Sequence, residues 1–455
     1  MKSKTVIYFL ILSLIILALG SCNEAIFHTI SEEVKILSAY IKGSPTNFVM
    51  FKDEMYVASG KKLYKYNGMI WKEINLEFFI TQLAATDTYF YILSFPDTSS
   101  SGKTILKCSA NPMPDTGKPV WVGEGDEKEI KINNYNYNYN EIQAIYTANN
   151  TLYVGAVTKV PSINAGERFK VFKTTDNTNF TETGIKGRFG NETAVLKNEE
   201  LRGVATNGTS DFICTRSGIY KDDSNTLIPP PASSSSQPDY IRIIKLADNT
   251  IAAITRNGTL YKIDTNATLI SNINVSRRVN GSIAVCKINS NYFLLVGTSD
   301  TSTSTTSGYT HGYREMQLSA SGGFNPAGSD GAFSTTNIFK DPGGSISSVD
   351  DNTTYKSSIG VVPINHFFHF PGTTEVPDGI LFASTQQKGI WSFRQGDVSW
   401  NADNMELCAN CNEENHASVK CGCIIKLIQR PNGEVQTPKQ PCLLCKIKKC
   451  PCINE

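Results

Sequence analysis

Short apolar runs, rich in β-branched and aromatic residues, alternate along most of the chain with turns rich in Gly, Asn, Asp and Ser. Runs of this composition that are bounded by turn residues are typical of β-strands. A 3.6-residue spacing of apolar positions, which indicates an amphipathic helix, is visible only over residues 30–42. The pattern therefore predicts a mostly β protein.

One strand pattern repeats seven times between residues 46 and 400. Each copy consists of an apolar strand, a short turn, a second strand, a glycine hairpin, a third strand and a polar turn. The copies average about 50 residues, which suits a four-stranded unit in a radial repeat. The glycine before the third strand marks each copy, at Gly60, Gly102, Gly166, Gly218, Gly258, Gly312 and Gly389.

A large aromatic residue recurs after the closing turn of the repeat. It is Trp71, Trp121 or Trp400 in three copies and Phe180 in another, so three of the four tryptophans share one place. An aromatic ring at the start of an outer strand can bury a large area against the neighbouring unit. We expect these rings to pack between consecutive units.

The repeat resembles that of a β-propeller, and we predict an all-β, seven-bladed β-propeller over residues 46–404. The competing fold is a pair of stacked β-sandwiches, which the repeat disfavours. Residues 229–238, 298–308 and 319–344 are of low complexity. Such segments bury little apolar surface, so we expect them to be exposed loops.

The N-terminus has the pattern of an export signal. Lys2 and Lys4 precede an apolar core of about 14 residues, which is shorter than the roughly 20 residues of a membrane span. The core ends in Leu19-Gly20-Ser21-Cys22, which resembles the bacterial lipobox. We therefore predict a lipoprotein signal peptide over residues 1–21, acylation of Cys22, and a lipidated tether over residues 22–45. The alternative is an ordinary secretory signal that leaves Cys22 as a spare thiol.

A cysteine-rich tail is predicted over residues 405–455. Its spacing favours two all-cysteine zinc sites, whereas an exported small domain normally forms disulfides, which we favour. Either arrangement makes the tail a cross-linked appendage. The cysteines concerned are Cys408, Cys411, Cys421, Cys423, Cys442, Cys445, Cys450 and Cys452.

Charge and motifs argue against several kinds of chemistry. The formal charge of +1 becomes about −1 once Lys2 and Lys4 are removed, which gives no electrostatic footprint for nucleic acid. His366 and His369 lie in an extended pattern that places them on opposite faces, so a packed aromatic segment is favoured over a metal site. The turn around Asp176 resembles an Asp box but departs from it, and we expect it to stabilise a turn. No catalytic constellation is found, so we expect a protein that is not an enzyme and a propeller without a cofactor.

Residues 133–140 read NNYNYNYN, which places Tyr135, Tyr137 and Tyr139 on one face of an extended segment. The simpler interpretation is an edge strand or a surface loop. The alternative is a partner contact, because tyrosine supplies rigid amphipathic area.

The lipobox at Leu19 to Cys22, the variable-loop propeller repeats and the cysteine-rich end together resemble surface lipoproteins of treponemal spirochaetes. That group includes fibronectin-binding adhesins. The resemblance implies a chain attached to the outer membrane or cell surface by its N-terminal lipid, with a fibronectin-like glycoprotein of the host matrix as partner. A periplasmic scaffold in outer-membrane assembly is the alternative, with a periplasmic location, and a glycan-acting propeller enzyme is a second alternative.

Overall fold

The computed structural model describes most of the chain between residues 39 and 403 and two short strands beyond it. The described residues are 39–68, 71–95, 105–114, 117–122, 132, 141–190, 197–222, 224–231, 237–272, 278–288, 291–299, 312–325, 364–372, 379–386, 388–394, 400–403, 428–429 and 435–436. The chain divides into two units, residues 1–38 and residues 39–455, and all described residues belong to the second. These residues include no helix with the length and apolarity that a bilayer crossing requires.

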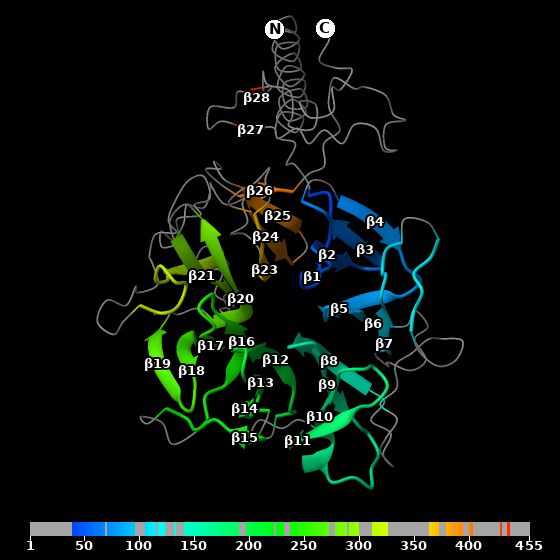
Figure 1. Ribbon diagram of the computed structural model, residues 1–455, viewed down its shortest axis with the longest axis vertical. Coiled ribbons are helices and arrows are strands. Elements are labelled where there is room, and N and C mark those ends of the chain that lie inside the picture. Colours follow the sequence, from blue (N-terminus) through cyan, green and yellow to red (C-terminus); the bar gives the residue numbers. More distant parts are fainter. Residues whose placement is uncertain are drawn as a thin grey trace, which may run out of the picture. The chain divides into compact units, whose positions relative to one another are not determined.

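Seven antiparallel sheets of three or four strands follow one another along residues 49–402, and strand order in each sheet follows chain order. Figure 1 shows the first strand of each sheet around one central axis, with the later strands farther out. The protein is a seven-bladed β-propeller, which confirms the predicted fold class.

Blade 1 consists of β1 (Val49–Phe51), β2 (Glu54–Ser59), β3 (Lys62–Tyr66) and β4 (Trp71–Asn75), and blade 2 of β5 (Phe79–Ala85), β6 (Phe90–Phe95) and β7 (Ile105–Ser109). Blade 3 consists of β8 (Glu141–Ala148), β9 (Thr151–Val157), β10 (Phe169–Thr174) and β11 (Thr181–Gly187), blade 4 of β12 (Leu201–Thr206), β13 (Asp211–Thr215), β14 (Gly218–Lys221) and β15 (Thr226–Leu227), and blade 5 of β16 (Tyr240–Lys245), β17 (Ile251–Thr255), β18 (Thr259–Ile263) and β19 (Ala267–Asn272). Blade 6 consists of β20 (Arg278–Ile288), β21 (Asn291–Ser299) and β22 (Gly312–Gln317), and blade 7 of β23 (Ile364–Phe370), β24 (Ile380–Thr385), β25 (Gly389–Arg394) and β26 (Asn401–Ala402). A 3₁₀ turn, η1 (Ala165–Glu167), precedes β10, and β27 (Ile428–Gln429) pairs with β28 (Val435–Gln436).

The predicted glycine hairpins join the second strand to the third in blades 1, 4, 5 and 7, at Gly60, Gly218, Gly258 and Gly389. Gly312 is the first residue of β22, Gly166 lies in η1 within a longer connection, and Gly102 lies outside the described residues. Gly60, Gly258 and Gly389 have φ values of 62°, 87° and 75°. A side chain strains the backbone in this left-handed region, which explains why one residue type recurs there.

The recurring outer aromatic residues pack onto the preceding blade, as predicted. Trp71 of blade 1 is buried, and its ring lies 5.8 Å from that of Phe382 in blade 7. Trp400 packs in the same way on blade 6, and Phe180 on blade 2. Trp121 joins the apolar cluster that blades 1 and 2 share. The interior is thus a series of apolar clusters between neighbouring blades.

Residues 39–43 close the ring by pairing with blade 7. The Gly389 N–H donates to the Gly43 carbonyl over 2.9 Å, and the Tyr40 N–H donates to the Asp403 carbonyl over 2.8 Å. The sequence repeat places the start of the propeller at residue 46 and does not predict this contact. The start and the end of the propeller are therefore joined by backbone hydrogen bonds.

The side chain of Asp403 adds a second contact across the same junction. Its Oδ2 accepts the indole N–H of Trp71 over 2.6 Å, and its Oδ1 accepts the Ser392 hydroxyl over 2.9 Å. Asp403 is 6% exposed. A buried carboxylate with two such donors ties blade 1 directly to blade 7.

Closure of the ring predicts that two hairpin glycines differ in their tolerance of alanine. A Cβ at Gly389 would lie 2.0 Å from the Ile41 carbonyl oxygen, whereas a Cβ at Gly60 meets nothing within 4 Å. Both substitutions strain a left-handed residue by about 1 kcal/mol. We expect Gly389→Ala to lower the free energy of unfolding by at least about 2 kcal/mol more than Gly60→Ala, because it also breaks the closing pairs.

Urea unfolding of the two variants and the wild type measures this difference. Equal losses for Gly389→Ala and Gly60→Ala would contradict the role given to residues 39–43.

Candidate functional site

A β-bulge interrupts the inner strand of six blades. The register against the second strand shifts in β5, β8, β12, β16, β20 and β23. Gln82, Arg242 and His366 occupy the same place, directly after the bulge of their strands. Bulges re-aim side chains, and here they bring polar groups from separate blades to the central axis.

A cavity of about 280 Å³ lies where these inner strands converge. The blades that supply its walls are 1, 2, 3, 5, 6 and 7. It is lined by Asn47, Phe48, Thr81, Gln82, Tyr146, Arg242, Gly281, Ile283, His366 and Phe367.

Arg242 is held in place by groups from three other blades. Its Nη1 donates to the Tyr146 hydroxyl over 2.7 Å and to the Arg202 carbonyl over 3.1 Å, and its Nε donates to the Gly281 carbonyl over 3.1 Å. The guanidinium carbon lies 5.5 Å from the centre of the Tyr146 ring. Among the described residues, Arg242 makes no ion pair with a carboxylate, and its Nη2 has no hydrogen-bond partner. The cavity thus contains a fixed cation whose charge the described side chains leave unneutralised.

Two amide side chains in the cavity wall each pair with both backbone groups of one residue in the next blade, as a neighbouring strand would. Asn47 donates to the Leu83 carbonyl over 2.8 Å and accepts the Leu83 N–H over 3.0 Å. Gln82 does the same to Ile145, over 2.5 and 3.1 Å. Each amide therefore ties its blade to the next one and uses its oxygen in doing so.

His366 is a neutral wall of the cavity at ordinary pH. Burial and then the nearby charge of Arg242 lower the pKa of its imidazole to about 3. His366 pairs with Ser384 in the ladder, and His369 pairs with Leu381, so the predicted extended segment is confirmed as strand β23. The described residues contain no cluster of three or more His, Cys, Asp or Glu side chains that could hold a metal ion.

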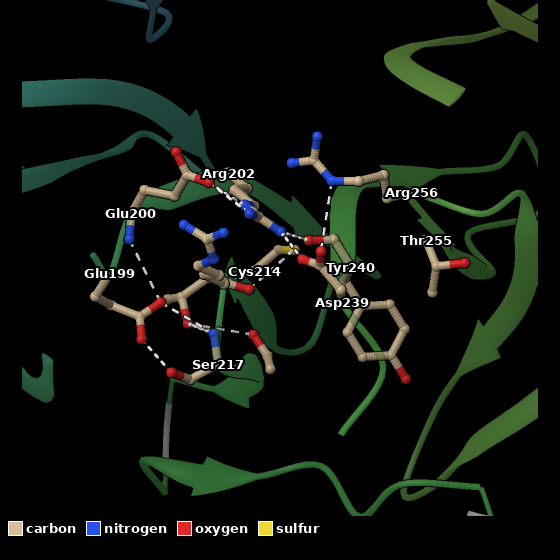
Figure 2. A network of polar contacts seen from close by, with 12 residues as sticks. Glu199, Glu200, Arg202, Cys214, Ser217, Asp239, Tyr240, Thr255 and Arg256 are labelled. Atoms are coloured by element: carbon tan, nitrogen blue, oxygen red, sulfur yellow. Dashed lines mark hydrogen bonds and ion pairs between the residues drawn. The ribbon is translucent and has the colours of Figure 1, made fainter. Parts of the chain in front are cut away.

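A second polar cluster, shown in Figure 2, joins blades 4 and 5 around Arg202. Arg202 pairs with Glu200 and with Asp239, each over 2.5 Å, and donates to the Tyr240 carbonyl. Arg256 approaches Asp239 from the other side, over 3.5 Å. Burial acts to raise the pKa of Asp239, but the hydrogen bond and charge of Arg202 outweigh it and lower that pKa. Since Arg202 is 6% exposed and its charge is paired with two carboxylates, its role is to join blades 4 and 5.

The turn around Asp176 is stabilised locally, as predicted. The Asp176 carboxylate accepts the Thr178 and Asn179 N–H groups over 2.9 and 2.8 Å, and these hydrogen bonds lower the pKa of Asp176 well below its usual range. The left-handed Asn177 accepts the Tyr91 hydroxyl over 2.5 Å from blade 2. The segment connects outer strands β10 and β11 and contributes nothing to the cavity lining.

Several predicted site residues lie outside the described residues. They are Cys22, the three tyrosines Tyr135, Tyr137 and Tyr139, and the eight tail cysteines Cys408, Cys411, Cys421, Cys423, Cys442, Cys445, Cys450 and Cys452.

Three further cysteines, Cys108, Cys214 and Cys286, are buried and free, and burial raises the pKa of all three thiols. They are small core residues within the blades.

The cavity residues were missed by the sequence analysis, although a signal for some of them exists. Gln82, Arg242 and His366 each lie two positions after an apolar residue at or near the start of the inner strand. A polar residue is unexpected at that place in a strand buried on both faces. Asn47 and Tyr146 carry no comparable signal.

No protein-family model matches the chain, and neither does a curated protein sequence. Similar solved structures include YCF48 bound to a D1 peptide, at 12% identity and a TM-score of 0.44 over 79% of this chain and 96% of that one. YCF48 from Cyanidioschyzon merolae is 8% identical, with a TM-score of 0.34 over 79% and 98% of the two chains. An ancestral GH74 enzyme is 14% identical, with a TM-score of 0.40 over 79% and 46%. These similarities concern the propeller fold alone.

The two arginines around Asp239 are expected to differ in their contribution to stability. Arg202→Met removes a buried cation that holds Glu200, Asp239 and the Tyr240 carbonyl, so we expect a loss of about 2 kcal/mol in the free energy of unfolding. The matched Arg256→Gln removes an exposed partner of the same carboxylate and should cost less than about 0.5 kcal/mol. Chemical denaturation measures both losses. A larger loss of unfolding free energy for Arg256→Gln would show that the buried Arg202 is not what holds blades 4 and 5 together.

The depressed pKa of His366 predicts loss of stability in mild acid. The imidazole has a pKa of about 3 in the folded protein against an ordinary value of 6.5, so the unfolded chain binds one more proton between these pH values. Neutral His366 makes its full contribution to the free energy of unfolding above pH 6.5. Below that pH the contribution falls by up to about 1.4 kcal/mol per pH unit.

We therefore expect His366→Gln to unfold with a shallower pH dependence than the wild type between pH 7 and pH 5. The difference in unfolding free energy between the two proteins should narrow by about 2 kcal/mol over that interval. Parallel curves would mean that the imidazole titrates alike in both states.

Proposed function

We propose that this chain is a lipid-anchored binding protein of a bacterial cell envelope, and an adhesin for a glycoprotein of the host matrix. The anchor is supported by the lipobox that ends at Cys22, and the propeller supplies the binding scaffold. The observation that carries the proposal is Arg242, a cation fixed by three blades at the edge of a central cavity. Pre-organised polar groups in a concave site are the usual basis of specific recognition.

The size of the cavity indicates what kind of contact it makes. Its volume of about 280 Å³ lies just below the range for small-molecule sites. It suits one side chain or terminal group of a larger partner, with the rest of that partner on the surrounding face. Phe79 and Phe95 are opposite each other at the same end of blade 2, and they are 41% and 38% exposed. Exposed aromatic pairs of this kind are typical of protein contacts.

Two other functions remain as alternatives. A periplasmic scaffold would use the same fold and anchor on the inner side of the outer membrane. A glycan-acting enzyme would use two carboxylates across its substrate. The described residues that line the cavity contain amide, phenol, imidazole and guanidinium groups but no carboxylate, which favours binding over hydrolysis.

Protease shaving of intact cells tests the proposal. We expect cleavage within residues 229–238 or 298–308 while a known periplasmic protein survives, and saturable binding of the purified chain to immobilised fibronectin. The Cys22→Ser variant is the control, because it lacks the acylated residue and should leave the cell surface. A chain that resists protease until the outer membrane is broken is no adhesin, and the periplasmic scaffold then stands.

A further inference from the structure

We propose that the central cavity binds a single carboxylate group, held by Arg242 and Tyr146. This proposal names the ligand class of the proposed binding function. It rests on that function only where it takes the carboxylate to come from a protein partner.

The first argument is the charge balance of the cavity. Arg242 is anchored by two backbone carbonyls and a phenol, all of them neutral acceptors, and no described carboxylate pairs with it. By contrast, Arg202 one blade away has two carboxylate partners. A guanidinium that is held by neutral groups on one side attracts an anion on the other, more strongly than in bulk water because the surroundings are less polarisable.

The second argument is a count of donors and acceptors. The Tyr146 oxygen already accepts from Arg242, so its O–H proton is left to donate. The side-chain oxygens of Asn47 and Gln82 accept backbone N–H groups, and each NH₂ group makes one of its two hydrogen bonds to a backbone carbonyl. The groups that remain are mostly donors, which is the complement of an oxyanion.

The third argument selects the anion. His366 is neutral at ordinary pH, so Arg242 supplies the one formal charge among the described residues that line the cavity. One positive charge balances a carboxylate, whereas a phosphate dianion would keep an unpaired charge in a confined space. The carboxylate has two sources, an acidic side chain or chain terminus of a protein, or a free small acid.

The test is binding of small probes to the purified full-length chain. The small probes are sodium acetate, sodium succinate and sodium sulfate at constant ionic strength. The peptide probe is a labelled peptide that ends in glutamate, and its controls are the same peptide with a C-terminal glutamine and the same peptide with an amidated C-terminus. Fluorescence anisotropy follows the peptides, and the thermal midpoint follows the small anions, because a ligand of the folded state raises it.

Three variants localise the site. Tyr146→Phe removes the phenol donor and keeps the ring, so we expect about tenfold weaker carboxylate binding. Arg242→Gln should abolish binding, and its thermal midpoint without ligand shows whether it is folded. Arg256→Gln is the matched control, since it removes an arginine of the same blade that lies outside the cavity lining, and it should bind as the wild type does.

The outcomes distinguish the two sources of the carboxylate, and they distinguish failure of the cavity proposal from failure of the adhesin proposal. Binding of the glutamate peptide but not of acetate or succinate assigns the site to a protein carboxylate, and the reverse assigns it to a free acid. Sulfate that binds as tightly as the carboxylates, no probe binding by the wild type, or an unaffected Tyr146→Phe would each overturn the proposal. Failure of fibronectin binding while these probes still bind refutes the adhesin and leaves the site.

Discussion

Closure of the ring by residues 39–43 is the constraint on which the rest of the structure depends. The hydrogen bonds from Gly389 to Gly43 and from Tyr40 to Asp403 join the first blade to the last, and Asp403 reinforces them through Trp71. Without this junction, the apolar faces that blades 1 and 7 pack against each other would be exposed to water, which is costly. The central cavity takes its walls from blades 1, 2, 3, 5, 6 and 7, so its geometry exists only in the closed ring.

The polar groups near the axis link successive blades, and one of them, Arg242, carries the recognition that we propose. Asn47, Gln82, Arg202 and Arg242 each donate a hydrogen bond to the backbone of the following blade. These forward links cross the blade boundaries in the same direction, and apolar clusters fill the space farther out. Because Arg242 uses one nitrogen for its forward link and a second for hydrogen bonds to blades 3 and 4, its position is fixed before any ligand arrives. This rigidity lowers the entropy cost of binding to one remaining nitrogen.

The sequence predicts the blades well because their signals are local. The hairpin at Gly60 and the outer ring of Trp71 follow from turn chemistry and residue size, which recur with the repeat. The cavity and the closure depend on pairs that are far apart in the chain. Tyr146 and Arg242 are 96 positions apart, and Trp71 and Asp403 are 332 apart. Gln82, Arg242 and His366 do stand out as polar residues in apolar strands, but the pattern does not show which side chains meet at the axis, so the cavity could not be placed from sequence.

The most direct test of the account is a crystal structure of the purified chain grown in sodium glutamate. We expect a closed ring with a carboxylate within about 3 Å of Arg242 Nη2 and of the Tyr146 hydroxyl. A carboxylate side chain of the protein itself paired with Arg242, or a cavity filled by the chain's own residues, would contradict the account, because the cation would then already be neutralised.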